Sequence, residues 1–166
     1  MSAPSDPSAR GTPRDPVALA LLLAGVSLAL AVAFTMPTLH FRGADKSLLG
    51  LAPWDAVPWL TKLKLGFLAA AVAAAFLPRL AALRVPLTAA AVVMMFLPAI
   101  GALVAAVYQW SDVRAGIVQM AGVRTPWIDP GWGIVALLVA ALMVIGSLWR
   151  AHRAAAASAG AARAAG

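Results

Sequence analysis

Four long runs of apolar residues, separated by polar segments, dominate the pattern of this chain. The first run, from Val17 to Phe34, contains no charged residue. A helix needs about 20 mostly apolar residues to cross a hydrocarbon core about 30 Å thick. The pattern therefore predicts four transmembrane helices, over residues 16–34, 58–78, 86–110 and 131–149.

Residues that commonly begin or bend helices support these limits. Asp15 followed by Pro16 predicts an N-cap and the first residue of the first helix. Asp55 is the candidate cap of the second helix. Pro98 lies in the middle of the third helix and removes a backbone hydrogen bond, so we expect a kink there.

The polar segments differ in character. Residues 1–15 are rich in Pro, Ser and Gly and predict a disordered cytoplasmic arm. The transmembrane domain is expected over 16–150, and the Ala-rich, low-complexity tail at 151–166 is expected to fray or to be disordered. Residues 38–42 alternate between apolar and polar side chains and predict a short strand. The predicted fold class is an all-α membrane protein, an antiparallel bundle of four transmembrane helices with short strands in its outer loops.

A cleaved signal peptide is the alternative interpretation of the first run. Two arginines precede it, and residues 31–33 (AVA) resemble a cleavage site. The run is longer than the roughly 7–15 apolar residues of a signal peptide, which favours a membrane span.

Composition excludes other classes of protein. Of the 166 residues, 63% are hydrophobic and 11% are charged, so neither a soluble domain nor a disordered chain fits. The net charge is +7, but the basic residues flank the apolar runs, which indicates lipid headgroups as partners and no nucleic acid. The chain has no Cys, and hence no disulfide or thiolate site.

An even number of spans places both termini on one side of the membrane. Basic residues in the short segments beside the spans, such as Arg79, Arg84 and Arg150, lie on the same side of the membrane as the two termini. Since such residues favour the cytoplasmic side, we expect both termini in the cytoplasm, in a bacterial cytoplasmic membrane.

Small residues repeat at four-residue spacing along the spans and predict close contact between helices. The candidate packing positions are Gly25, Gly66, Ala70, Gly101 and Ala136.

Two lysines near the start of the second span are the most distinctive polar feature. Lys62 and Lys64 lie in the first two turns of this helix, and Asp112 and Asp55 are candidate partners for an ion pair or polar site. The favoured interpretation is snorkelling of both ammonium groups to the interface, with a structural ion pair or transport chemistry as alternatives. Residues two apart lie about 200° around a helix, so both cannot face the bundle.

Aromatic side chains gather on the outer side of the predicted topology. Rings prefer the headgroup region, so a membrane-interface belt is the favoured interpretation, with contact to a lipid, quinone or partner helix as the alternative. These candidates are Trp54, Trp59, Tyr108, Trp110, Trp127 and Trp132.

No catalytic set, metal site or cofactor motif is found in the sequence. His40 and His152 are predicted on opposite sides of the membrane, and no Ser/His/Asp set, carboxylate pair or phosphate loop occurs. We therefore expect no enzyme activity, no metal and no cofactor.

Two short segments carry a resemblance. Residues 53–59 (PWDAVPW) lead into the second span and residues 130–133 (PGWG) open the fourth. In this layout, over residues 16–150, the chain resembles small, mostly uncharacterised bacterial four-helix membrane proteins of claudin-like topology. The paired cysteines and Gly-Leu-Trp signature of claudin outer loops are absent. The resemblance implies an arrangement of spans and loops, and names no activity.

A fainter similarity, to paraquat-inducible lipid-transport proteins, rests on residues 47–50 (SLLG) and the lysines beside the second span. The zinc-binding cysteines of that family are absent, so no site residue is carried over.

The absence of catalytic residues, together with the small-residue helix faces, predicts a non-enzymatic accessory or structural subunit. It would pack laterally on a larger membrane complex or form a homo-oligomer, surrounded by membrane lipids. The alternative is a small transporter or lipid-handling protein that uses the outer-side Lys and Asp residues.

Overall fold

Four long helices form the body of the molecule in a computed structural model that describes residues 15–43, 48–121 and 126–164. They are α1 (Pro16–Phe34), α3 (Pro58–Phe76), α4 (Arg84–Tyr108) and α6 (Trp132–Ala164). All four are long and apolar enough to cross a membrane. The predicted fold class is confirmed, and the chain fits an integral membrane protein.

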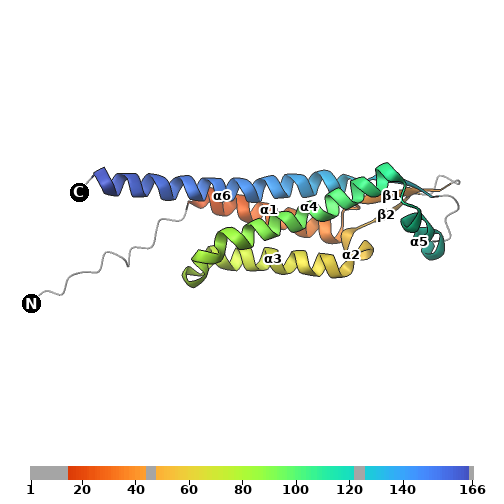
Figure 1. Ribbon diagram of the computed structural model, residues 1–166, viewed down its shortest axis with the longest axis horizontal. Coiled ribbons are helices and arrows are strands. Elements are labelled where there is room, and N and C mark those ends of the chain that lie inside the picture. Colours follow the sequence, from red (N-terminus) through yellow and green to blue (C-terminus); the bar gives the residue numbers. More distant parts are fainter. Residues whose placement is uncertain (1–14, 44–47, 122–125, 165–166) are drawn as a thin grey trace, which may run out of the picture.

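The helices form an elongated antiparallel bundle (Figure 1). Helix α1 packs along α6, α3 packs along α4, and α4 also contacts α6. A short 3₁₀ turn, η2 (Pro78–Leu83), joins α3 to α4 at the end of the bundle where α1 begins. The opposite end carries a small sheet.

The sheet combines strands from two different connections. Strands β1 (Leu39–Arg42) and β2 (Leu48–Leu51) form a hairpin, and β3 (Trp127–Pro130) pairs with the other edge of β1, in the order β2-β1-β3. All pairing is antiparallel. Phe41 and Ile128 are directly opposite each other and are buried. The strand predicted at 38–42 is confirmed as β1, and the sheet covers one end of the bundle.

Two further helices lie in the connections at the sheet end. Helix α2 (Pro53–Ala56) precedes α3, and α5 (Ser111–Ala121) follows α4, in connections where the sequence predicts no helix. The prediction that Asp55 caps α3 is wrong. Asp55 lies inside α2, and the cap position of α3 is Val57, which makes no side-chain cap. Pro58 has no N–H, so the start of α3 has one unpaired backbone donor fewer that a cap would have to satisfy.

The predicted cap of α1 is confirmed: the Asp15 carboxylate accepts a hydrogen bond from the Val17 N–H at 2.9 Å. Of the disordered arm predicted at 1–15, residues 1–14 lie outside the described residues. The expectation that the C-terminal tail frays or is disordered is wrong as far as Ala164, because α6 continues through it. Alanine has the highest helix propensity, which favours continuation of the helix.

The small residues at predicted packing positions differ in their surroundings. Gly25 is buried in the contact between α1 and α6, where an added Cβ would lie 2.8 Å from Val144 Cγ2. Ala136 packs partly buried against the core, and Ala70 is half-buried. Gly66 and Gly101 are exposed, and an added Cβ at either would meet nothing within 4 Å. The prediction of close helix contact at these two glycines is therefore wrong within this chain.

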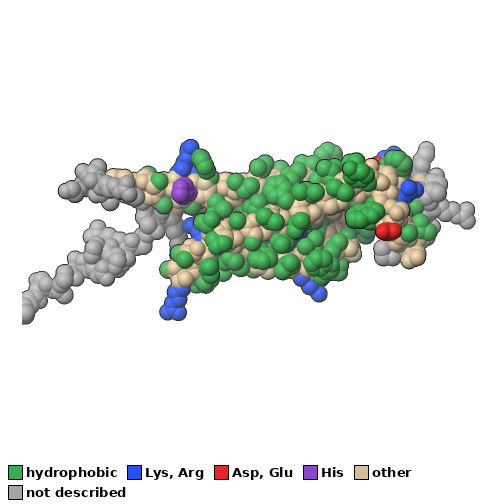
Figure 2. Space-filling model, in the orientation of Figure 1, with side chains coloured by type: hydrophobic (Ala, Val, Ile, Leu, Met, Phe, Trp, Pro, Cys, Tyr) green, Lys and Arg blue, Asp and Glu red, His purple; other side chains and the backbone are tan. Residues whose placement is uncertain are grey.

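The outer surface of the bundle is apolar along its length. Large apolar side chains such as Leu142, Val93 and Ile100 are more than half exposed. Figure 2 shows hydrophobic side chains over the middle of the bundle and charged side chains toward its two ends. A surface of this kind is stable against lipid rather than water.

Candidate functional site

A cavity of about 240 Å³ lies at the sheet end of the bundle, between α3 and α4. Leu60 and Lys64 of α3 form one side, and Leu97 and Gly101 of α4 form the other. Toward the sheet the cavity is bounded by residues of β1, α2 and α5. Most of the lining is aliphatic, which is typical of sites for apolar or amphipathic molecules.

Pro98 lines the same cavity. Helix α4 runs through this residue without interruption. A proline cannot donate a hydrogen bond to the carbonyl group four residues earlier, here that of Met94. The predicted kink stays a prediction, but the structure places the proline beside the cavity.

The hydroxyl group of Thr61 is already used within the protein. It lies 2.9 Å from the carbonyl oxygen of Pro53 and 3.2 Å from that of Val57, and it donates to these backbone groups. Thr61 is 3% exposed. Its role in the structure is to hold α2 against the start of α3, and so to shape one wall of the cavity.

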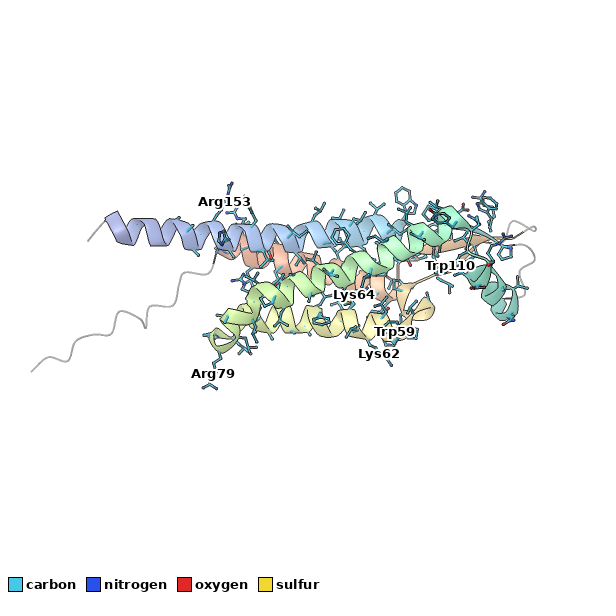
Figure 3. All side chains as sticks on the ribbon, viewed as in Figure 1. Trp59, Lys62, Lys64, Arg79, Trp110 and Arg153 are labelled. Atoms are coloured by element: carbon cyan, nitrogen blue, oxygen red, sulfur yellow. The ribbon has the colours of Figure 1, made fainter. Side chains whose placement is uncertain are left out.

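Lys64 is the one charged side chain among the described residues that line the cavity. It is 1% exposed, and its Nζ atom has no hydrogen-bond partner among the described residues. Figure 3 shows it between α3 and α4. The favoured interpretation from the sequence, snorkelling, is therefore wrong for Lys64. The packing of α3 against α4 turns this side chain into the bundle.

Lys62 has a different environment. It is exposed and points away from the bundle, as Trp59 does (Figure 3). Its Nζ atom lies 5.8 Å from the centre of the Trp54 ring, within the range of a cation–π contact. The two lysines therefore occupy opposite sides of α3, as their spacing requires.

The ion pairs considered as an alternative for the lysines do not form among the described residues. Asp55 and Asp112 are both exposed, and the salt bridges of the described residues join other groups. Asp112 lies in the first turn of α5 and Asp55 lies in α2, and neither carboxylate forms a hydrogen bond or salt bridge with the buried Nζ of Lys64.

The aromatic candidates lie in elements at the sheet end. Trp59, Tyr108, Trp110, Trp127 and Trp132 are all at least half exposed. Trp54 is partly buried, and its ring centre lies 5.1 Å from that of Phe34. Of this group, Trp110 lines the cavity. This distribution fits rings at a membrane interface, with one ring beside the cavity.

Two further interactions at the sheet end are not predicted by the sequence pattern. Gln109 follows α4 and hydrogen-bonds the backbone of Ile128 in β3. The exposed Arg42 and the partly buried Asp129 form a salt bridge of 3.2 Å between β1 and β3. For the Gln109 contact, the available signal was a polar residue at the end of a long apolar run. The salt bridge between Arg42 and Asp129 depends on a pairing of strands that are far apart in the chain.

At the opposite end, Asp15 and Arg150 join the start of α1 to α6. The guanidinium Nε of Arg150 donates to the Asp15 carboxylate at 3.1 Å. This hydrogen bond is the main reason why the pKa of Asp15 lies below its usual value of 3.8. The contact lies at the far end of the bundle from the sheet and so takes no part in the cavity.

The described residues that line the cavity with Lys64 include no Ser, Cys, His, Asp or Glu. An ammonium group in apolar surroundings is stabilised when an anion or another acceptor joins it. The arrangement is therefore suited to a ligand with one polar end and an apolar body.

No protein-family model matches this chain, and no curated protein or solved structure is significantly similar to it.

Proposed function

We propose that this protein is a lipid-handling membrane protein that binds one amphipathic molecule in the cavity between α3 and α4. The observation that carries this proposal is the Lys64 side chain, buried in an aliphatic cavity with no acceptor for its Nζ among the described residues. Ionisable groups inside a membrane are costly, and such groups commonly mark pathways or binding sites.

The position of the cavity supports entry from the bilayer. Leu97 is 46% exposed and Gly101 is also exposed, although both line the cavity. The space is thus accessible from the surface that faces lipid. Nonpolar molecules partition into the bilayer, so a lateral opening gives them a direct route to the site.

Filling the cavity tests this proposal. Gly101→Leu would place a side chain where a Cβ meets no atom within 4 Å, and Gly66→Leu is the matched control on an exposed part of α3 outside the cavity. We expect Gly101→Leu to reduce labelling by a photoactivatable C12 amphiphile in phosphatidylcholine nanodiscs at least about tenfold, and Gly66→Leu to leave it unchanged. Equal labelling of both variants and the wild type contradicts the proposal.

The side of the membrane on which the cavity opens is part of the same proposal. With both termini in the cytoplasm of a bacterial cell, the cavity lies in the outer leaflet. The chain has no Cys, so single-cysteine variants report accessibility without background. We expect an impermeant maleimide to label Ser111→Cys in intact cells and His152→Cys only after lysis. The reverse pattern would place the opening in the inner leaflet.

Lateral packing on a larger membrane complex is the second candidate function. The observation that favours it is the exposed Gly66 on α3, where another helix could approach closely. Purification of the tagged protein in mild detergents tests this candidate. A co-purifying membrane protein that is lost in Gly66→Leu supports it, and a single monodisperse chain in every detergent argues against it.

A further inference from the structure

The geometry points to a single-chain amphiphile with one singly charged anionic head group as the ligand of the cavity, its head group bound by Lys64. This inference rests on the function proposed above and names the class of ligand. It follows from charge, from the positions of the polar groups, and from volume.

Charge complementarity selects the head group. Neither Asp55 nor Asp112 pairs with the buried Lys64 ammonium, so no carboxylate of the described residues supplies its counter-charge. The Thr61 hydroxyl donates to backbone carbonyl groups, so it does not compete with Lys64 as a donor to the head group. A carboxylate would form a charge-assisted hydrogen bond with Nζ, about twice as strong as a bond between neutral groups.

The depth of Lys64 sets the orientation of the ligand. Lys64 lies six residues into α3, about 9 Å from its start at the sheet end at 1.5 Å per residue. Trp110 and Val113 line the end of the cavity nearer the sheet, and Figure 3 shows Trp110 displaced from Lys64 in that direction. The head group therefore lies on the deep side, and the apolar chain extends past Leu60 and Gly101 toward Trp110.

Volume limits the size of the ligand. Cavities of about 150 Å³ hold a molecule as large as benzene. The cavity here, of about 240 Å³, is larger but falls below the roughly 300–1,000 Å³ of sites for drug-sized ligands. One slender chain fits, whereas the two chains of a phospholipid do not.

The test compares C12 amphiphiles that differ in their head groups. Full-length protein in phosphatidylcholine nanodiscs is titrated with dodecanoate, dodecanol, dodecyl phosphate and dodecyltrimethylammonium, with empty nanodiscs to correct for partitioning. We expect dodecanoate to bind at least about tenfold more tightly than dodecanol, the effect of one hydrogen bond to a charged group. Dodecyl phosphate should bind less tightly than dodecanoate, because one ammonium leaves its second charge unpaired.

Substitution of the lysines isolates the role of the charge. Lys64→Met keeps a long flexible side chain and should abolish the preference for dodecanoate over dodecanol while retaining dodecanol binding. Lys64→Arg should retain a preference for the anion. Lys62→Met, on the outward side of α3, is the matched control and should bind as the wild type does.

The outcomes separate the two proposals. Equal affinity for dodecanoate and dodecanol in the wild type, tighter binding of dodecyl phosphate or the cationic amphiphile, or an anion preference that survives in Lys64→Met would overturn the assignment of the ligand class but leave the cavity as a binding site. Failure of every amphiphile to bind would overturn the proposed function itself.

Discussion

The side-chain amide of Gln109 hydrogen-bonds the backbone of Ile128 in both directions. Its Nε2 donates to the Ile128 carbonyl at 2.8 Å, and its Oε1 accepts from the Ile128 N–H at 2.9 Å. Gln109 also has φ of 48°, in the left-handed region, where α4 ends. The amide thus takes the place of a neighbouring strand at the free edge of β3 and attaches the sheet to α4.

Gln109→Ala should detach this edge of the sheet. Both backbone groups of the buried Ile128 would lose their partners, and we expect the free energy of unfolding to fall by about 1–3 kcal/mol. Reversible unfolding in mixed micelles measures the change. Tyr108→Ala, at a neighbouring residue that is 77% exposed, is the control and should have little effect. A Gln109→Ala protein as stable as the wild type would show that the sheet does not depend on this contact.

Stability should depend on pH through Asp15. The hydrogen bond from Arg150 lowers the pKa of Asp15 below 3.8 in the folded protein, so the folded state binds this proton less readily than the unfolded state. The contribution is fully present above the unfolded value and is lost as pH falls through the folded pKa. Asp15→Asn retains an N-cap but not the charge. We therefore expect a lower Tm for Asp15→Asn at pH 7, and a difference from the wild type that disappears in acid. A difference of constant size from pH 7 to pH 2 would rule out this origin.

Gly25 and Gly66 should respond in opposite ways to the same substitution. In Gly25→Ala the new methyl group would lie 2.8 Å from Val144 Cγ2 and 2.9 Å from the Ala140 carbonyl oxygen, so α1 and α6 must separate. We expect a loss of about 1–3 kcal/mol in unfolding free energy. Gly66→Ala adds a methyl group in open space and improves helix propensity, so this variant should be as stable as the wild type or more so. Equal destabilisation by both changes would argue against this helix packing.

Lys64→Met should stabilise the ligand-free protein. It replaces a buried group without an acceptor by an apolar side chain of similar length, for which we expect a gain of at least about 1 kcal/mol in unfolding free energy. Lys62→Met, at an exposed position, should change stability by less than about 0.5 kcal/mol. Thermal unfolding in detergent compares the two. A destabilised Lys64→Met protein would mean that Nζ has a structural partner.

The long helices are predictable because their apolar runs match the thickness of a bilayer. The start of α1 is equally predictable, because Asp15 and Pro16 determine it through local interactions within the first turn of the helix. By contrast, the spacing of Lys62 and Lys64 shows that only one of them can face the bundle, but does not show which. The rotation of α3 about its axis is set by its packing against α4. Because α3 is rich in Ala, several of its faces are similarly small, and the sequence does not distinguish which face packs.

The remaining errors have related physical origins. A stripe that contains Gly66 or Gly101 allows a close helix approach but does not require one. Pairing of β1 with β3 brings Arg42 beside Asp129 and Phe41 opposite Ile128, and such distant pairings have no local signal. The Lys64 site shares this property, because four elements in addition to α3 bound its cavity.

Helix α6 is longer than a membrane is thick. It has 33 residues, about 50 Å at 1.5 Å per residue, against a hydrocarbon core of about 30 Å. Trp149, with Arg153 stacked 4.8 Å from its ring centre, marks the level of the interface. The part of the helix beyond it is a rigid spacer of roughly 20 Å. A fluorescent protein joined to the C-terminus would consequently be held clear of the headgroups, at a nearly constant height that energy transfer to a membrane dye would report.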